Sequence, residues 1–179
     1  LFEKMLRHPG IRVHLNTDFR TIQSQIRADA MVIYTGMIDE FFDYSLGELE
    51  WRSLRFEQET LPVRDYQGTA VVNYVDESIP YIRIHEFKHY HPERVEPYRL
   101  AKSVICREYP REWRRGDEAF YPINTTRNQR LLEQYELLAG KYEKVIFGGR
   151  LGCYRYWNMD QAVLHALEYF ETRICNRKK

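Results

Sequence analysis

The chain has 179 residues, of which 44% are hydrophobic and 30% are charged. This is the balance of a folded globular protein and excludes a disordered chain. Its 27 basic and 26 acidic residues leave a net charge of +1, so the overall charge gives no case for binding nucleic acid or an anionic membrane. The apolar runs are too short for a membrane-spanning helix, and no signal peptide opens the chain. We expect a single domain over residues 1–179, with neither nucleic acid nor a membrane as partner.

Short elements of both kinds alternate through the first half of the chain. The pattern predicts a helix over residues 1–6, strands over 11–15 and 30–34, a short helix over 38–44 that closes near Gly47, and a strand over 51–57. Segments 69–75 and 80–90 are two further strands, and the turn residues between them indicate a hairpin.

The second half contains the longer helices. We expect a strand over residues 103–108, a polar loop over 111–116, a helix over 126–139 with Gly140 at its C′ position, and a strand over 144–147. A loop over 148–157 then leads to a helix over 159–174, whose predicted buried stripe is Val163, Leu167, Phe170 and Ile174. The predicted fold class is α/β with α+β character, a mostly antiparallel, tyrosine-rich mixed sheet with a few flanking helices.

The segment over residues 145–161 is the most informative one for function. Gly148 and Gly149 follow a strand and allow another group to approach the backbone closely. Arg150 comes next and suits a phosphate or an electron-rich ring edge. Asn158 is a good N-cap, and the free N–H groups of the helix behind it favour an anion or a flavin that carries negative charge. Taken alone, the same residues also fit an ordinary glycine turn and an ordinary helix cap.

Several ordered motifs carry a family resemblance. The run Gly-Gly-Arg-Leu-Gly-x-Tyr-x-Tyr-x-x-Met-Asp-Gln over residues 148–161 resembles the C-terminal flavin motif of UDP-galactopyranose mutases. Segments at residues 34–43, 52–57, 67–74, 83–89, 107–110 and 116–122 agree with the same family in the same order. The resemblance spans nearly the whole chain and corresponds to roughly the C-terminal half of a family member.

This resemblance implies an isomerase that interconverts UDP-galactopyranose and UDP-galactofuranose for cell-surface polysaccharide biosynthesis. Reduced FAD is implied as the covalent catalyst, with flavin N5 as the nucleophile, so that no catalytic side chain is expected. A Gly-x-Gly-x-x-Gly turn for the pyrophosphate is absent from this sequence. We therefore expect the chain alone to bind FAD weakly or not at all and to be inactive without an N-terminal half. The resemblance leaves a homodimer open.

The resemblance also assigns residues to the two ligands. Substrate contacts fall on Asn73, Arg83, Tyr121 and Tyr156. Flavin contacts fall on Arg150, Asn158, Met159, Asp160 and Gln161, with weaker assignments to Thr17, Asp18 and Arg55. The family usually has Tyr-Asp where this chain has Trp157-Asn158, a change that removes a negative charge beside the flavin and the substrate.

The hairpin offers a geometric check of two of these residues. If its turn centres on Ser78, Asn73 and Arg83 lie directly opposite each other and point to one face. Tyr81, His85 and Phe87 would share that face, while Ile82 and Ile84 would point into the core. The alternative is a solvated arginine on an exposed face of the sheet.

Histidine and cysteine do not form a recognised metal pattern in this sequence. His85, His89 and His91 are close in sequence, but their spacing is not a zinc pattern and no carboxylate or cysteine completes the set. We therefore expect no metal site. The three cysteines are odd in number and unpaired in spacing, which indicates reduced thiols in the cytoplasm.

Two other interpretations remain open from sequence alone. In the first, the chain is a non-catalytic module that binds a sugar nucleotide or a protein partner; Asn158 and the absent dinucleotide turn fit this interpretation. In the second, the chain is part of a flavin oxidoreductase of the amine-oxidase type; Arg83 and Tyr121 argue against this interpretation.

Overall fold

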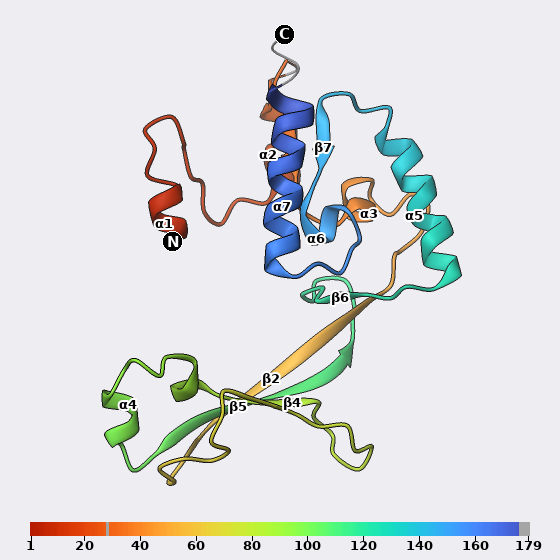
Figure 1. Ribbon diagram of the computed structural model, residues 1–179. Coiled ribbons are helices and arrows are strands. Elements are labelled where there is room, and N and C mark those ends of the chain that lie inside the picture. Colours follow the sequence, from red (N-terminus) through yellow and green to blue (C-terminus); the bar gives the residue numbers. More distant parts are fainter. Residues whose placement is uncertain (28, 176–179) are drawn as a thin grey trace.

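The computed structural model of the protein describes residues 1–27 and 29–175. It has mixed α and β structure, as predicted, arranged in two lobes (Figure 1). The helical lobe contains most of the helices and a small parallel sheet. The sheet lobe contains the far end of a five-stranded antiparallel sheet, and the long strands β2 (Trp51–Leu61) and β5 (Ser103–Glu112) connect the two.

The five-stranded sheet has the order β3-β4-β5-β2-β6. Its shorter strands are β3 (Val71–Asn73), β4 (Arg83–Glu86) and β6 (Tyr121–Pro122). The hairpin is confirmed in its predicted register, because Asn73 pairs directly with Arg83. Residue 78 is therefore the centre of the turn.

The second hairpin strand is shorter than the sequence indicates. It ends at Glu86, and a 3₁₀ helix, η2 (Phe87–Tyr90), follows where a strand was predicted. The buried amine of Lys88 explains the turn, because its Nζ donates to the backbone carbonyls of Arg64 and Lys102. These contacts draw the chain away from the sheet edge. The helix α4 (Glu96–Arg99) then leads into β5.

A cluster of buried hydrophobic side chains lies in the helical lobe. There α5 (Thr126–Ala139) matches its predicted bounds, with Thr125 as its N-cap, and packs near the short helix α3 (Ile38–Phe41). Gly140 is the C-cap of α5, with a right-handed φ of −59°, and not its C′ residue as predicted. The buried cluster that joins these helices to the start of β2 consists of Ile38, Leu49, Trp51, Leu131, Leu132, Tyr135 and Tyr154.

A parallel pair of short strands lies beside this core. The strand β1 (Val32–Tyr34) pairs with β7 (Val145–Phe147), and the small helix α6 (Gly149–Gly152) follows β7 where a loop was predicted. Sheets with parallel strands are usually covered on both faces and continued at their edges. Here the pair has no further strand among the described residues, and Ile33 is exposed.

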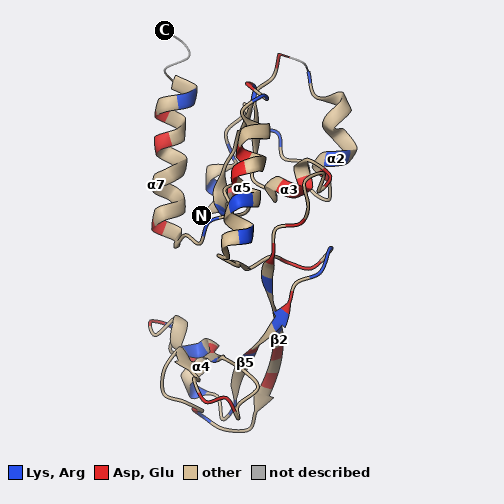
Figure 2. Ribbon diagram, turned by 90° about the vertical axis from the view of Figure 1, so that its right-hand side faces the viewer, with Lys and Arg blue, Asp and Glu red and all other residues tan. Residues whose placement is uncertain are grey.

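The last helix turns its apolar side outward. It runs as α7 (Met159–Tyr169) and continues as the π-helical η3 (Phe170–Cys175), which matches the predicted length. The predicted burial was wrong: Val163 is 60% exposed, Leu167 57% and Phe170 51%. The side that packs inward carries His165 and Tyr169 instead. Figure 2 shows α7 standing at one side of the lobe, and no described helix is long and apolar enough to cross a bilayer.

The first residues of the chain are also exposed. The helix α1 (Phe2–Met5) forms as predicted, but residues 11–15 form no strand. A strand needs a paired neighbour for its backbone groups, and none of the described residues pairs with this segment. Two short helical turns, α2 (Phe19–Ile22) and η1 (Gln23–Gln25), then lead toward β1. The strand predicted over residues 11–15 is therefore wrong.

The three free cysteines differ in their surroundings. Burial raises the pKa of the Cys153 thiol to about 11 and also raises the pKa of Cys106, whereas Cys175 is exposed. A higher thiol pKa leaves less of the reactive thiolate at neutral pH. We expect iodoacetamide at about pH 7.5 to label Cys175 readily and Cys153 about 100-fold more slowly. Mass spectrometry of a labelling time course measures both rates, with the guanidinium-unfolded chain as control; equal rates in the folded chain would contradict the burial of Cys153.

Candidate functional site

A row of side chains crosses the sheet beside the hairpin. Directly opposite residues of antiparallel strands point to the same face, and the register aligns Asn73 with Arg83, Arg83 with Glu108, and Glu108 with Phe56. Arg83 Nε donates to Asn73 Oδ1 at 2.7 Å, and Arg83 Nη1 lies 3.4 Å from Glu108 Oε2. The guanidinium is therefore held from two sides, and neither contact uses Nη2.

A second group of side chains lies at the junction between the helical lobe and the sheet. Arg150, on α6, donates from Nη2 to the carbonyl of Phe120 at 2.8 Å. Its guanidinium carbon lies 5.9 Å from the ring centre of Tyr121 and 5.1 Å from that of Tyr156. The two tyrosine rings are themselves 5.5 Å apart. Arg150 and Tyr156, from the motif over residues 148–161, thus form one cluster with Tyr121 from the segment over residues 116–122.

Aromatic contacts join the two groups into one surface. Tyr121 pairs with Arg52, which shares a strand face with Phe56. The ring of Phe120 lies 5.7 Å from that of Phe56, the neighbour of Glu108 in the row. We call this surface the arginine face; it comprises Asn73, Arg83, Glu108, Phe56, Phe120, Tyr121, Tyr156 and Arg150. Arg83 and Arg150 therefore lie on the same side of the sheet.

An open cavity of about 670 Å³ lies at the hairpin end of this face. His85 and Glu108 line it, together with Cys106 from the same sheet. Its remaining walls are mostly aromatic side chains: Phe56, Phe87, Tyr90 and His91. Such a combination of aromatic walls and a few polar groups is typical of sites for small polar molecules.

The end of α7 nearest this face is capped as predicted. The backbone N–H of Asn158 donates to Gln161 Oε1 at 2.9 Å, which fixes the first turn of the helix. Met159 and Asp160 follow and are exposed, Met159 to 87%.

The backbone turns into α6 at Gly149, whose φ of 71° favours glycine. Gly152 lies so close to strand β1 that a Cβ there would approach the carbonyl of Tyr34 at 3.0 Å.

Three predicted residues lie away from the arginine face. Arg55 points to the opposite side of β2 from Phe56, stacks 4.0 Å over the ring of Tyr109 and pairs with Glu57. Thr17 and Asp18 are exposed at the start of α2, where Asp18 accepts the backbone N–H of Arg20 at 2.8 Å.

Arg20 also sets the charge of this helix start. Its guanidinium pairs with the Asp18 carboxylate at 2.8 Å and holds the pKa of that carboxyl below its usual value. Asp18 therefore acts as a helix cap whose charge is already paired.

Two predicted details of the hairpin face are wrong. Tyr81 packs on the opposite side, with its ring 5.9 Å from that of Tyr109, and Ile82 is exposed although Ile84 is buried. Both differences arise because β4 begins only at Arg83, so strict alternation does not reach back to these residues.

Glu108, His85 and Tyr90 complete the surroundings of Arg83. The hairpin register placed His85 on the face of Arg83, whereas Glu108 and Tyr90 were not assigned from sequence. Glu108 lies in a segment that carried the family resemblance, but its proximity to Arg83 depends on the pairing of β4 with β5. These strands are separated by 16 residues, and no short-range pattern reports their register.

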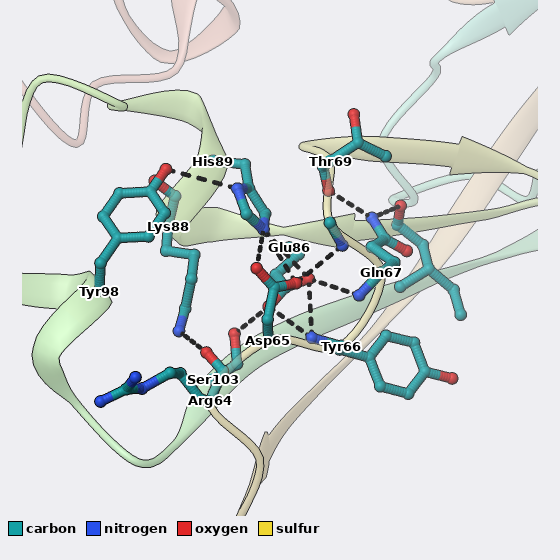
Figure 3. A network of polar contacts seen from close by, with 12 residues as sticks. Arg64, Asp65, Tyr66, Gln67, Thr69, Glu86, Lys88, His89, Tyr98 and Ser103 are labelled. Carbon is teal, nitrogen blue, oxygen red and sulfur yellow. Dashed lines mark hydrogen bonds and ion pairs between the residues drawn. The ribbon is translucent and has the colours of Figure 1, made fainter.

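A second polar cluster surrounds Glu86 (Figure 3). Glu86 follows His85 on β4 and so points to the face of the sheet opposite Arg83. His89 Nε2 is 3.2 Å from both Asp65 oxygens and 3.5 Å from Glu86 Oε2, so the three residues have the spacing of a metal-binding group. The expectation that no carboxylate would complete the histidine set was therefore wrong. The hydrogen bonds of Glu86 argue against a metal, because its two oxygens already accept the backbone N–H groups of Tyr66 and Gln67 and the hydroxyl of Ser103.

The buried Glu86 carboxylate instead fastens the loop over residues 64–68 to the sheet (Figure 3). We expect Glu86→Ala to lower the free energy of unfolding by about 3 kcal/mol, because several donors lose a charged acceptor together. Denaturant unfolding followed by circular dichroism measures this change. Glu59→Ala, which removes an exposed carboxylate from β2, is the control and should cost about 0.5 kcal/mol. Equal losses in both variants would show that the network is not structural.

Comparison with known proteins finds a matching family model and several relatives. The family model described as UDP-galactopyranose mutase matches residues 1–156. A dTDP-fucopyranose mutase of Escherichia coli is 33% identical over all of this chain and 48% of its own length. A probable UDP-galactopyranose mutase of Klebsiella pneumoniae is 36% identical over all of this chain and 46% of its own length. The UDP-galactopyranose mutase of Mycoplasma pneumoniae is 31% identical over 93% of this chain and 44% of its own length. The chain thus spans less than half the length of these relatives, and it belongs to the UDP-galactopyranose mutase family.

Proposed function

We propose that this chain forms the C-terminal half of an isomerase that interconverts UDP-galactopyranose and UDP-galactofuranose with reduced FAD. The observation that carries the proposal is the arginine face, because it places two guanidinium groups and two tyrosines on one continuous surface. A diphosphate flanked by a sugar and a nucleoside needs this combination of paired N–H donors and aromatic contacts. The role of such an enzyme would be cytoplasmic supply of a furanose sugar for cell-surface polysaccharides.

Arg83 is the residue we assign to the diphosphate. Asn73 orients the guanidinium through Nε, so the rotamer is already selected before a ligand arrives. Tyr121 and Tyr156 lie at the other end of the face and would donate hydroxyl groups to the diphosphate and near the sugar.

The cofactor side of the proposal rests on Arg150 and the start of α7. Arg150 is placed against two tyrosine rings, and Asn158 to Gln161 present an exposed helix start. Both features suit a flavin that carries negative charge. Reduced FAD, when bound, would supply the nucleophilic nitrogen for attack on the anomeric carbon. The residues of this chain would orient the diphosphate and hold the sugar on the aromatic face. Within residues 1–27 and 29–175, Thr17, Asp18 and Arg55 have no contact that links them to this site.

A complete site would need the rest of the protein. Three surfaces support this: the outward apolar side of α7, the open edges of the β1–β7 pair, and the exposed segment over residues 1–15. Exposed apolar area of this extent usually marks an interface. We propose that the half absent from this chain, which would carry the dinucleotide-binding turn, covers these surfaces.

The direct test is catalysis by the full-length protein. With FAD and dithionite, chromatography should detect UDP-galactofuranose formed from UDP-galactopyranose, and the oxidised protein should be much less active. The 179-residue chain alone should show no turnover and no stoichiometric FAD uptake. Absence of turnover with UDP-galactose would contradict the proposed substrate. Because one relative is a dTDP-fucopyranose mutase, dTDP-fucose belongs in the same assay, and absence of turnover with either sugar would favour a non-catalytic binding module.

A further inference from the structure

Arg83 shares its carboxylate partner with a histidine. Glu108 lies beneath the guanidinium with a side chain only 7% exposed. Its Oε2 faces Arg83 Nη1 at 3.4 Å, and its Oε1 lies 2.5 Å from His85 Nε2. Since both cations compete for one buried carboxylate, the charge state of His85 affects how strongly Glu108 neutralises Arg83.

His85 can gain a proton without losing its partners. When the ring is neutral, Nε2–H donates to Glu108 and Nδ1 accepts the hydroxyl hydrogen of Tyr90. When the ring is protonated, Nε2–H still donates to Glu108 and Nδ1–H donates to the Tyr90 oxygen. Both forms satisfy every ring nitrogen, so the histidine is held in one place and only its charge changes.

The groups that face His85 come from three segments. Arg83 lies on its own strand, Glu108 and Cys106 lie on β5, and Tyr90 lies on η2. His91 lines the same cavity but pairs with Glu93 at 3.0 Å instead. Among the described contacts of His85, Glu108 is therefore the anion and Arg83 the nearby cation.

We propose that His85 and Glu108 are positioning residues for Arg83, and that protonation of His85 frees the guanidinium charge for the substrate diphosphate. This inference rests on the proposed function. With His85 neutral, the negative charge of Glu108 is compensated by Arg83 alone. With His85 protonated, the group of three carries one additional positive charge, so an anionic ligand should bind more tightly as the pH falls.

The test is the pH dependence of UDP-galactose binding to the full-length protein. UDP-galactose suits the purpose because its diphosphate is a diester whose charge is constant across the neutral range. Isothermal titration calorimetry at about pH 6 and pH 8 should show about 3- to 10-fold tighter binding at the lower pH. In His85→Gln the side-chain amide can still donate to Glu108 but cannot titrate, so this ratio should fall to near one.

His91→Gln is the matched control, because it removes a histidine from the same cavity that does not contact Glu108. It should keep the ratio of the unaltered protein. Thermal unfolding of both variants checks that the fold is retained. Glu108→Asp keeps the carboxylate and should therefore retain part of the pH ratio. If His85→Gln keeps the full pH ratio, or if the unaltered protein shows none, the inference is overturned. Failure of the proposed function is a separate outcome, in which Arg83→Ala leaves UDP-galactose binding unchanged at both pH values.

Discussion

Replacing Arg83 with alanine should weaken UDP-galactose binding to the full-length protein by about 30- to 100-fold. A half-buried guanidinium that meets a diphosphate makes charge-assisted hydrogen bonds worth about 2 to 3 kcal/mol. The same loss should appear in kcat/KM when furanose formation is followed by chromatography under reducing conditions. Asn73→Ala should give a smaller loss of about 3- to 10-fold, since it removes only the group that orients Nε.

Arg107→Ala is the control for this experiment. Arg107 lies on the neighbouring strand, but its register with Ile84 places it on the opposite side of the sheet, where it pairs with Glu59 at 2.7 Å. It should bind UDP-galactose like the unaltered protein. If Arg107→Ala weakens binding as much as Arg83→Ala, the arginine face is not the substrate surface.

The second large effect concerns the outward side of α7. Leu167→Asp should lower the free energy of unfolding of the full-length protein by about 3 kcal/mol, because it would place a carboxylate against the covering half. In the 179-residue chain the same change should cost about 0.5 kcal/mol or less, since Leu167 is exposed there. Denaturant unfolding of both proteins gives the comparison.

Leu137→Asp is the matched substitution, because Leu137 is an exposed leucine on α5 outside the proposed interface. It should have a small effect in both proteins. A loss for Leu167→Asp that is equal in the chain and in the full-length protein would argue that α7 faces solvent throughout.

These outcomes bear on how far the sequence can be interpreted alone. Local sequence patterns predicted the structure correctly where the interacting residues are close in sequence. The helix α5 has its predicted bounds, and a turn centred on Ser78 places Asn73 opposite Arg83. The same patterns did not predict the structure where burial depends on contacts with a distant part of the protein. The apolar spacing on α7 predicted burial of Val163, Leu167 and Phe170, and all three are exposed in the part of the chain that the structure describes.

The candidate site shows the same division. Arg83, Arg150, Tyr121 and Tyr156 came from motifs, and the structure gathers them on one face. Glu108 could not be assigned, because only the pairing of β4 with β5 brings it beneath Arg83. Arg55 lies on the opposite face of the sheet from Phe56, because neighbouring side chains of β2 point to opposite faces. A motif match does not show to which face a side chain points.

The narrowest part of the sheet has a mechanical consequence. Among the described residues, β6 pairs with β2 only at Trp51 and Arg52, and β4 pairs with β5 only over residues 105–108. Between them the sheet is a ribbon of two strands, and Pro110 within it lacks an N–H for the ladder. We expect flexure of this two-stranded section to change the distance between Arg83 in the hairpin and Arg150 on α6.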